Sequence, residues 1–147
     1  MTTAEKSFDS WPAATVAAVA DVLAETVDGL SGPEIGLLLE RIGFADADGS
    51  NKRERLTRAL LVRQARDRVS NCVVRFVTEA MAPVRYARQP GVICRRRDDL
   101  NEVLVLVGLR LTDAGKLARG TAANTLDEAV RHANSLRAEI RWRGTHP

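Results

Sequence analysis

Residues 31–43 read Ser-Gly-Pro-Glu-Ile-Gly-Leu-Leu-Leu-Glu-Arg-Ile-Gly, and this stretch contains the start, the buried face and the end of one helix. Ser31 and Glu34 have the spacing of a capping box, in which each side chain accepts a hydrogen bond from the other residue's backbone N–H. Gly43 suits a left-handed C-cap. The apolar positions between them recur at helical spacing and are Ile35, Leu38, Leu39 and Ile42. The stretch predicts an amphipathic helix.

Other parts of the chain show the same kind of signal, in which a capping residue or a proline precedes apolar residues at helical spacing. Further helices are expected over about 12–28, 51–66, 70–82, 98–107 and 125–143. Residues 84–97 are expected to be irregular, because Gln89-Pro90-Gly91 is typical of a turn. Residues 109–119 are expected to form a short β-hairpin, a candidate for the wing of a winged-helix domain. The sequence therefore predicts a mainly α-helical, compact domain of about six helices with one hairpin.

The length and composition fit one domain over 11–147, preceded by a flexible tail over 1–10. The hydrophobic share is 45% but the aromatic share is only 4%, so the core must be aliphatic. Cys72 and Cys94 are too few for a disulfide framework. Without a leader-like start or a stretch of transmembrane length, the chain is expected in the cytoplasm, away from membranes.

Positive charge is carried almost entirely by arginine, and it gathers in the expected helix over 51–66 and in the run Arg95-Arg96-Arg97. Because an arginine fork binds two phosphate oxygens at once, these cations are candidates for nucleic-acid contacts. The candidates are Lys52, Arg53, Arg55, Arg58, Arg63, Arg66, Arg95, Arg96 and Arg97. The alternative is a solvated charged face that Glu54 and Asp67 partly neutralise.

Three parts of the sequence, taken in order, carry a resemblance to a family. They are Asp28-Gly29-Leu30-Ser31-Gly32-Pro33-Glu34-Ile35-Gly36, then Leu100–Leu104 with Gly108–Leu111 and Asp113–Leu117, then Arg143-Gly144-Thr145-His146-Pro147. Their order and spacing resemble the N-terminal half of the bacterial conserved hypothetical proteins of the Ymh type, which belong with the abortive-infection proteins. The resemblance covers roughly residues 13–147 and rests on motifs in context.

In that family the His-Pro corner leads into a second domain similar to HEPN folds, a helical class that includes ribonucleases with a closely spaced Arg and His at a helix start. This chain ends at Pro147, before such a domain would begin, so the resemblance implies that the catalytic half is missing here. Arg141 and His146 match the Arg–His spacing, but Gly144 and Pro147 interrupt the helix that would display them. We therefore expect no catalytic residues and no enzyme.

The resemblance implies a non-catalytic recognition or regulatory module of a phage-defence protein, whose partner is an effector domain or a separate protein. Trp142 is the candidate partner-binding residue, because aromatic anchors are enriched at interfaces. The alternative is a DNA- or RNA-binding domain that uses the basic helix over 52–66 and the hairpin wing. No metal or other cofactor is expected, since the cysteines and histidines lack the closely spaced pair of a zinc site.

Overall fold

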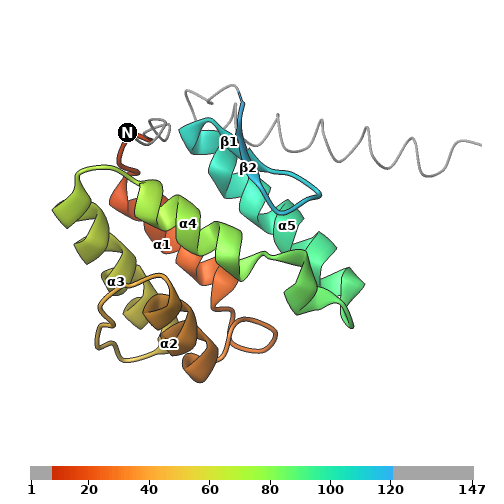
Figure 1. Ribbon diagram of the computed structural model, residues 1–147, viewed down its shortest axis with the longest axis horizontal. Helices are drawn as coiled ribbons and strands as arrows, with labels where there is room; N and C mark the ends of the chain where they lie inside the picture. Colours follow the sequence, from red (N-terminus) through yellow and green to blue (C-terminus); the bar gives the residue numbers. More distant parts are fainter. Residues whose placement is uncertain (1–7, 121–147) are drawn as a thin grey trace, which may run out of the picture.

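A computed structural model of the chain describes residues 8–120 (Figure 1). Its α-helices are α1 (Ala13–Leu23), α2 (Gly32–Arg41), α3 (Lys52–Asp67), α4 (Asn71–Ala80) and α5 (Pro90–Leu104). Its 3₁₀ turns and strands are η1 (Pro83–Tyr86), η2 (Val105–Val107), β1 (Leu109–Leu111) and β2 (Leu117–Arg119). The mainly helical fold with a short hairpin is confirmed, and residues 8–120 hold five α-helices, against about six predicted for the whole chain. The helix expected over 125–143, with Trp142, lies outside the described residues.

Helix α1 lies at the centre of the fold, with α3 packed on one side and α5 on the other. Helix α4 packs against α3 and α2, and the hairpin lies along α5 (Figure 1). The core between them is almost entirely aliphatic, as the composition predicts, and Phe76 is its largest fully buried side chain. The antiparallel hairpin pairs Leu109 with Arg119 and Leu111 with Leu117. The Asn101 side chain ties it to α5 by hydrogen bonds with the Leu111 N–H (2.6 Å) and carbonyl (3.2 Å).

The capping box that opens α2 is present as the sequence predicts. Ser31 Oγ accepts from the Glu34 N–H at 3.2 Å, and Glu34 Oε1 accepts from the Ser31 N–H at 3.0 Å. Gly43 follows the helix with a φ of 78°, the left-handed conformation in which glycine carries no Cβ penalty. Helix α3 begins with half of such a box, because Asn51 caps the Glu54 N–H at 2.9 Å while the Glu54 carboxylate turns to Ser50 and Arg58.

Two helix boundaries differ from the sequence-based expectation. Helix α1 ends at Leu23 rather than near residue 28, and Val27, an apolar residue of the expected helix, is 85% exposed. Helix α5 begins at Pro90, so the expectation of irregular structure is wrong for residues 90–97. Proline is favourable in the first helical turn because its missing N–H would have no partner there. The run Arg95-Arg96-Arg97 is therefore helical, and its three side chains leave the helix in different directions.

The chain already contacts the helical fold at Phe8, before Trp11, where the sequence places the start of the domain. Phe8 lies inside the expected tail, yet its N–H donates to Asn71 Oδ1 at 2.8 Å and its carbonyl accepts from the Ser70 N–H at 2.9 Å. The Ser70 hydroxyl also donates to the Phe8 carbonyl, so it does not cap α4. Within residues 8–120, the structure contains no helix with the length and apolarity needed to cross a membrane.

A buried glutamine fastens the start of the chain to α3. Gln64 is 7% exposed, its Oε1 accepts from the Trp11 N–H at 3.0 Å, and its Nε2 donates to the Trp11 carbonyl at 2.9 Å. We expect Gln64→Leu to lower the free energy of unfolding by about 2 to 4 kcal/mol, because both backbone groups lose their partner in a buried place. Urea unfolding followed by circular dichroism measures this loss. The exposed Gln89→Leu is the control, and an equal loss there would contradict the argument.

Candidate functional site

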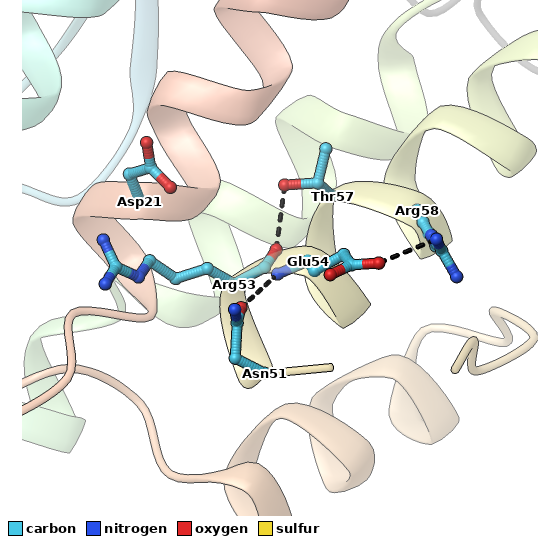
Figure 2. A pocket seen from close by; sticks show the side chains of 6 residues that line it. All are labelled: Asp21, Asn51, Arg53, Glu54, Thr57 and Arg58. Carbon is cyan, nitrogen blue, oxygen red and sulfur yellow. Dashed lines mark hydrogen bonds and ion pairs between the residues drawn. The ribbon is translucent and has the colours of Figure 1, made fainter. Parts of the chain in front are cut away.

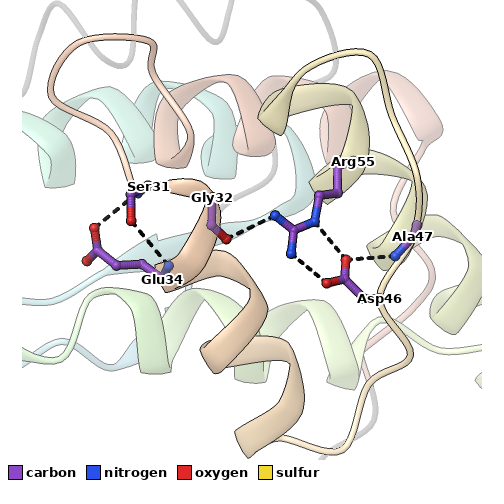
Figure 3. Close-up of polar contacts among 6 residues, drawn as sticks. All are labelled: Ser31, Gly32, Glu34, Asp46, Ala47 and Arg55. Carbon is purple, nitrogen blue, oxygen red and sulfur yellow. Dashed lines mark hydrogen bonds and ion pairs between the residues drawn. The ribbon is translucent and has the colours of Figure 1, made fainter.

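Arg55 on α3, one of the candidate cations, joins the start of α2 to the loop between α2 and α3 (Figure 3). Its Nε donates to Asp46 Oδ1 at 2.8 Å and its Nη2 to Asp46 Oδ2 at 2.5 Å. Its Nη1 donates to the Gly32 carbonyl at 2.9 Å. The side-chain hydrogen bonds from Arg55 hold the pKa of Asp46 below its usual value, and the same pair raises the pKa of Arg55. The fork expected to grip phosphate is occupied by a carboxylate of the same chain.

Lys52 and Arg53, at the first turn of α3, bind the loop between α1 and α2 (residues 24–31, the α1–α2 loop). Lys52 Nζ donates to the Leu30 carbonyl at 2.9 Å, and Arg53 Nη2 donates to Thr26 Oγ1 at 3.2 Å. The loop begins where α1 ends, and cations are favourable near a helix C-terminus because they oppose the helix dipole. These two residues therefore stabilise the turn between α1 and α2.

Arg58 and Arg63, further along α3, bind the loop between α2 and α3. Arg58 Nη1 donates to the Asp48 carbonyl at 3.1 Å, and Arg63 Nη1 donates to the Gly43 carbonyl at 3.0 Å. The Arg63 guanidinium also lies 4.9 Å from the centre of the Phe44 ring, within the range of a cation–π contact. Each arginine has an acid one helical turn away on α3: Glu54 for Arg58 (2.7 Å), and Asp67 for Arg63 (2.9 Å).

The arginine run of α5 reaches the same α1–α2 loop from the opposite direction. Arg95 Nη2 lies 3.0 Å from Asp28 Oδ2 at the surface. Arg96 is buried, its Nη1 donates to the Tyr86 hydroxyl at 2.6 Å, and its Nη2 donates to the Asp28 carbonyl. Its guanidinium also lies 5.4 Å from the centre of the Tyr86 ring. The structure therefore brings Lys52, Arg53, Arg95 and Arg96 together around one loop.

The remaining two candidate cations lie apart from that cluster. Arg97 points to the hairpin, where its Nη1 lies 3.0 Å from Asp113 Oδ1 in the turn between β1 and β2. Arg66 is exposed in the last turn of α3. All the candidate cations except Arg66 have a hydrogen-bond or ion-pair partner within residues 8–120. The basic pattern in the sequence therefore corresponds mostly to contacts that hold the loops of this fold.

An open hollow of about 450 Å³ lies between the end of α1 and the start of α3 (Figure 2). Its charged lining is mixed, with Asp21 and Glu54 beside Arg53 and Arg58. The Ser50 hydroxyl, followed by the Arg58 charge, lowers the pKa of Glu54. Glu54 is therefore a carboxylate near neutral pH and is not suited to donate a proton.

Two further features bear on chemistry in the part of the chain that the structure describes. Burial raises the pKa of the Cys72 thiol, so this residue stays in its unreactive protonated form and fills the core of α4. Across residues 8–120, no three side chains of histidine, cysteine, aspartate or glutamate gather as metal ligands would. The Arg141 and His146 pair lies outside the described residues.

The pKa of Asp46 makes its contact with Arg55 testable by pH. Because folding lowers this pKa, the unfolded chain takes up the proton first. The contact therefore stabilises the fold above the ordinary value of 3.8, and the stabilisation is lost as pH falls through the folded value. Asp46 is 43% exposed, so we expect Asp46→Asn to cost only about 0.2 to 1 kcal/mol at pH 7 and less at pH 3, below the ordinary pKa of 3.8. Urea unfolding at both pH values measures the difference, and an equal cost at both would exclude the ionic contact.

Sequence reasoning missed two partners of the arginines. Asp46 stands in a polar stretch that reads as an exposed loop, and only its distance to Arg55 in space shows that it neutralises that residue. Tyr86, the only tyrosine of the chain, lies in the stretch expected to be irregular, yet its hydroxyl is buried and donates to the Ala80 carbonyl at 2.9 Å. A single tyrosine in an aromatic-poor chain is the one signal that could have marked this position.

Comparisons of the chain with protein-family models, with curated proteins and with solved structures give no match, so they assign no family and no fold relative.

Proposed function

We propose that the chain is a non-catalytic recognition or regulatory module of an abortive-infection-type protein, which acts by binding an effector domain or a separate protein. The observation that favours this function is that most of the candidate cations bind groups of the same chain. Lys52, Arg63 and Arg96 donate to backbone carbonyls of loops, and Arg55 donates to the Gly32 carbonyl at the start of α2, so these cations tie the connections between the helices to the fold. A rigid surface suits protein recognition because little ordering is needed on binding.

The regulatory part of this proposal follows the resemblance to the abortive-infection proteins. A module of this kind shifts an effector between states only if it makes different contacts with each state. The expected effector is the HEPN-like domain of that family, supplied on a longer chain or by a neighbouring gene. The sequence motifs in the α1–α2 loop and in the hairpin support this assignment, and no enzyme activity is expected of the module itself.

A phage-challenge experiment tests the proposal. The chain is expressed in a bacterial host alone, and together with the coding sequence that continues or adjoins it in its genome. We expect protection from infection only with the adjoining product, and direct binding of the two purified products by calorimetry. Protection by the chain alone, or RNA cleavage by the purified chain, would overturn the assignment as a non-catalytic module.

A nucleic-acid-binding domain of winged-helix type is the second candidate function. Arg66, Arg68 and Arg75 favour it, because all three are exposed at the α3–α4 side of the fold and have no partner within the described residues. The hairpin that follows α5 would be the wing. Contacts with phosphates release counterions, so binding would weaken steeply as salt rises.

The experiment for this second candidate uses a gel shift of a generic DNA duplex and of an RNA hairpin over a range of salt concentrations. If the candidate is right, the unmodified protein binds at low salt and Arg66→Glu with Arg68→Glu abolishes the complex. The structure makes this pair more informative than Arg55 and Arg58, whose replacement also removes contacts with Asp46 and Asp48 in the α2–α3 loop. No complex at low salt would exclude the candidate.

A further inference from the structure

A polar pocket of about 260 Å³ lies where the α1–α2 loop faces η1 and the start of α5. In Figure 1 the loop follows the end of α1, beside the segment that runs from η1 into α5. The pocket is lined by Arg96 and Tyr86 from one side and by Asp28 and Glu34 from the other, with Arg85 also on the lining. It is separate from the basic surface of α3.

The hydrogen-bond donors of this pocket are not all used by the protein. Arg96 is only 6% exposed, and its Nη1 and Nη2 bind Tyr86 and Asp28, while its Nε has no partner within residues 8–120. In the same range, no side-chain nitrogen or oxygen is both sealed from the surface and unpaired. The Arg96 Nε is therefore not sealed from the surface, and Arg96 is one of the residues that line the pocket. Arg85 adds its two Nη groups, since only its Nε is bound, to the Glu79 carbonyl at 3.1 Å.

The two acids of the pocket are already engaged by other donors. Asp28 Oδ2 is bound by Arg95 at 3.0 Å, and Glu34 Oε1 accepts from the Ser31 N–H at 3.0 Å. The free donors therefore suit an incoming acceptor, and an arginine fork suits a carboxylate or a phosphate. The charges of Arg85 and Arg96 on the lining are balanced by those of Asp28 and Glu34, so a doubly charged phosphate gains little extra attraction over a carboxylate and loses more hydration. A single carboxylate is the better match.

The rim of the pocket indicates where that carboxylate comes from. Val27 lines the pocket and is 85% exposed; Val84 is not on the lining itself, but it directly precedes the lining residue Arg85 in the chain and is 82% exposed. Small-molecule sites usually have volumes of about 300 to 1,000 Å³, so this pocket is small for one. A free organic acid would leave both valines in water. An acidic side chain with apolar neighbours on a protein segment would fill the pocket and cover them.

We propose that this pocket binds the carboxylate of an aspartate or glutamate side chain from an apolar segment of a partner protein. The inference rests on the proposed function and names the surface and the chemistry by which the module recognises its partner. Arg96 and Arg85 bind the two carboxylate oxygens, and Val27 and Val84 contact the flanking apolar residues.

The test is a titration of the isotope-labelled protein with two capped pentapeptides, Ala-Val-Glu-Val-Ala and Ala-Val-Gln-Val-Ala, followed by nuclear magnetic resonance. We expect the glutamate peptide to shift the Arg96 Nε–H signal and the Val27 and Val84 methyl signals, with at least tenfold tighter binding than the glutamine peptide. Sodium acetate should shift Arg96 only at much higher concentration, without the methyl shifts. Inorganic phosphate should bind more weakly than acetate.

Two pairs of variants make the test specific. Arg85→Gln should weaken the glutamate peptide about tenfold through the loss of a charged hydrogen-bond donor. Arg88→Gln removes the same charge from an exposed residue that does not line the pocket, and it should bind as the unmodified protein does. Val27→Ser with Val84→Ser should weaken the peptide but leave the acetate affinity unchanged.

Equal binding of the two peptides would overturn the inference, and so would equal losses in Arg85→Gln and Arg88→Gln. Tighter binding of phosphate or acetate than of the glutamate peptide would do the same, because it would identify a small-anion site. These failures are distinct from a failure of the proposed function, which is measured by binding of the intact adjoining protein. If the peptide does not bind but the adjoining protein does, the partner interface lies outside this pocket. If the adjoining protein does not bind, the proposed function as a recognition module is wrong.

Discussion

Gly29→Ala is expected to lower the free energy of unfolding by about 3 kcal/mol or more, among the largest effects of any single methyl group in this protein. An added Cβ at Gly29 would lie 2.1 Å from the Glu25 nitrogen, 2.3 Å from the Glu25 oxygen and 2.6 Å from the Ala24 carbonyl carbon. All three atoms belong to the backbone, so no rotation of a side chain relieves the overlap. The α1–α2 loop must open to admit the methyl group.

Opening that loop has consequences beyond the overlap itself. The Gly29 N–H donates to the Glu25 carbonyl at 3.0 Å, and the carbonyls on either side of it, at Asp28 and Leu30, are the acceptors for Arg96 and Lys52. A shift of the loop therefore weakens the contacts that α3 and α5 make with it. We expect the carboxylate pocket to lose its peptide affinity in the same variant.

The matched control is Gly91→Ala in the first turn of α5, where an added Cβ would meet nothing within 4 Å. Alanine there restricts the unfolded chain and should be neutral or stabilise the fold by up to about 1 kcal/mol. Urea unfolding of both variants, followed by circular dichroism, compares the two methyl groups directly. Equal stabilities for Gly29→Ala and Gly91→Ala would show that the α1–α2 loop is not packed as described.

The sequence could predict the parts of this fold that depend on local signals. The capping box of Ser31 and Glu34 and the apolar stripe behind it give α2 correctly, and the alternation around Asp113 gives the hairpin. Local signals failed where one residue fits two structures. Pro90 is compatible with a turn and with the first turn of a helix, and only the packing of α5 on α1 decides between them. The end of α1 was predicted wrongly because Val27 keeps the helical spacing of the apolar residues although the helix has already ended at Leu23.

The candidate site was less predictable because a sequence shows which residues are charged but not which distant residues they contact. The sequence identifies Arg55 and Arg96 as cations but not their partners, Asp46 and Tyr86, which become neighbours only through the fold. Neutralisation by Glu54 and Asp67, by contrast, could be predicted, since each lies one helical turn from an arginine on α3. Long-range pairs are therefore the part of the site that sequence patterns leave undetermined.

Three consecutive arginines on α5 should respond very differently to the same substitution, and Arg96→Met is expected to cost about 2 to 4 kcal/mol of stability. The loss arises because the Asp28 carbonyl loses its donor and the Tyr86 hydroxyl loses one of its contacts. Arg95→Met and Arg97→Met break ion pairs with carboxylates that are 50% and 98% exposed, and each should cost less than about 1 kcal/mol.

An opposing effect has to be weighed at Arg96, since replacing a buried charge by an apolar side chain of similar volume is often neutral or stabilising. That gain depends on how completely the charge is removed from water. Arg96 is bound by the Tyr86 hydroxyl and the Asp28 carbonyl, and methionine can satisfy neither of these acceptors, so the gain from removing the charge is offset. The unpaired Asp28 carbonyl then dominates.

A double-mutant cycle with Tyr86→Phe separates the two effects. If the hydrogen bond between Arg96 and the Tyr86 hydroxyl carries part of the loss, the double variant should be more stable than the sum of the single losses predicts, by about 0.5 to 3 kcal/mol. Arg95→Met with Tyr86→Phe should be additive, because Arg95 and Tyr86 share no hydrogen-bond partner within residues 8–120. Additivity in both cycles, or a stability of Arg96→Met equal to that of Arg97→Met, would mean that Arg96 is an ordinary solvated residue and that the pocket has no buried cation at its base.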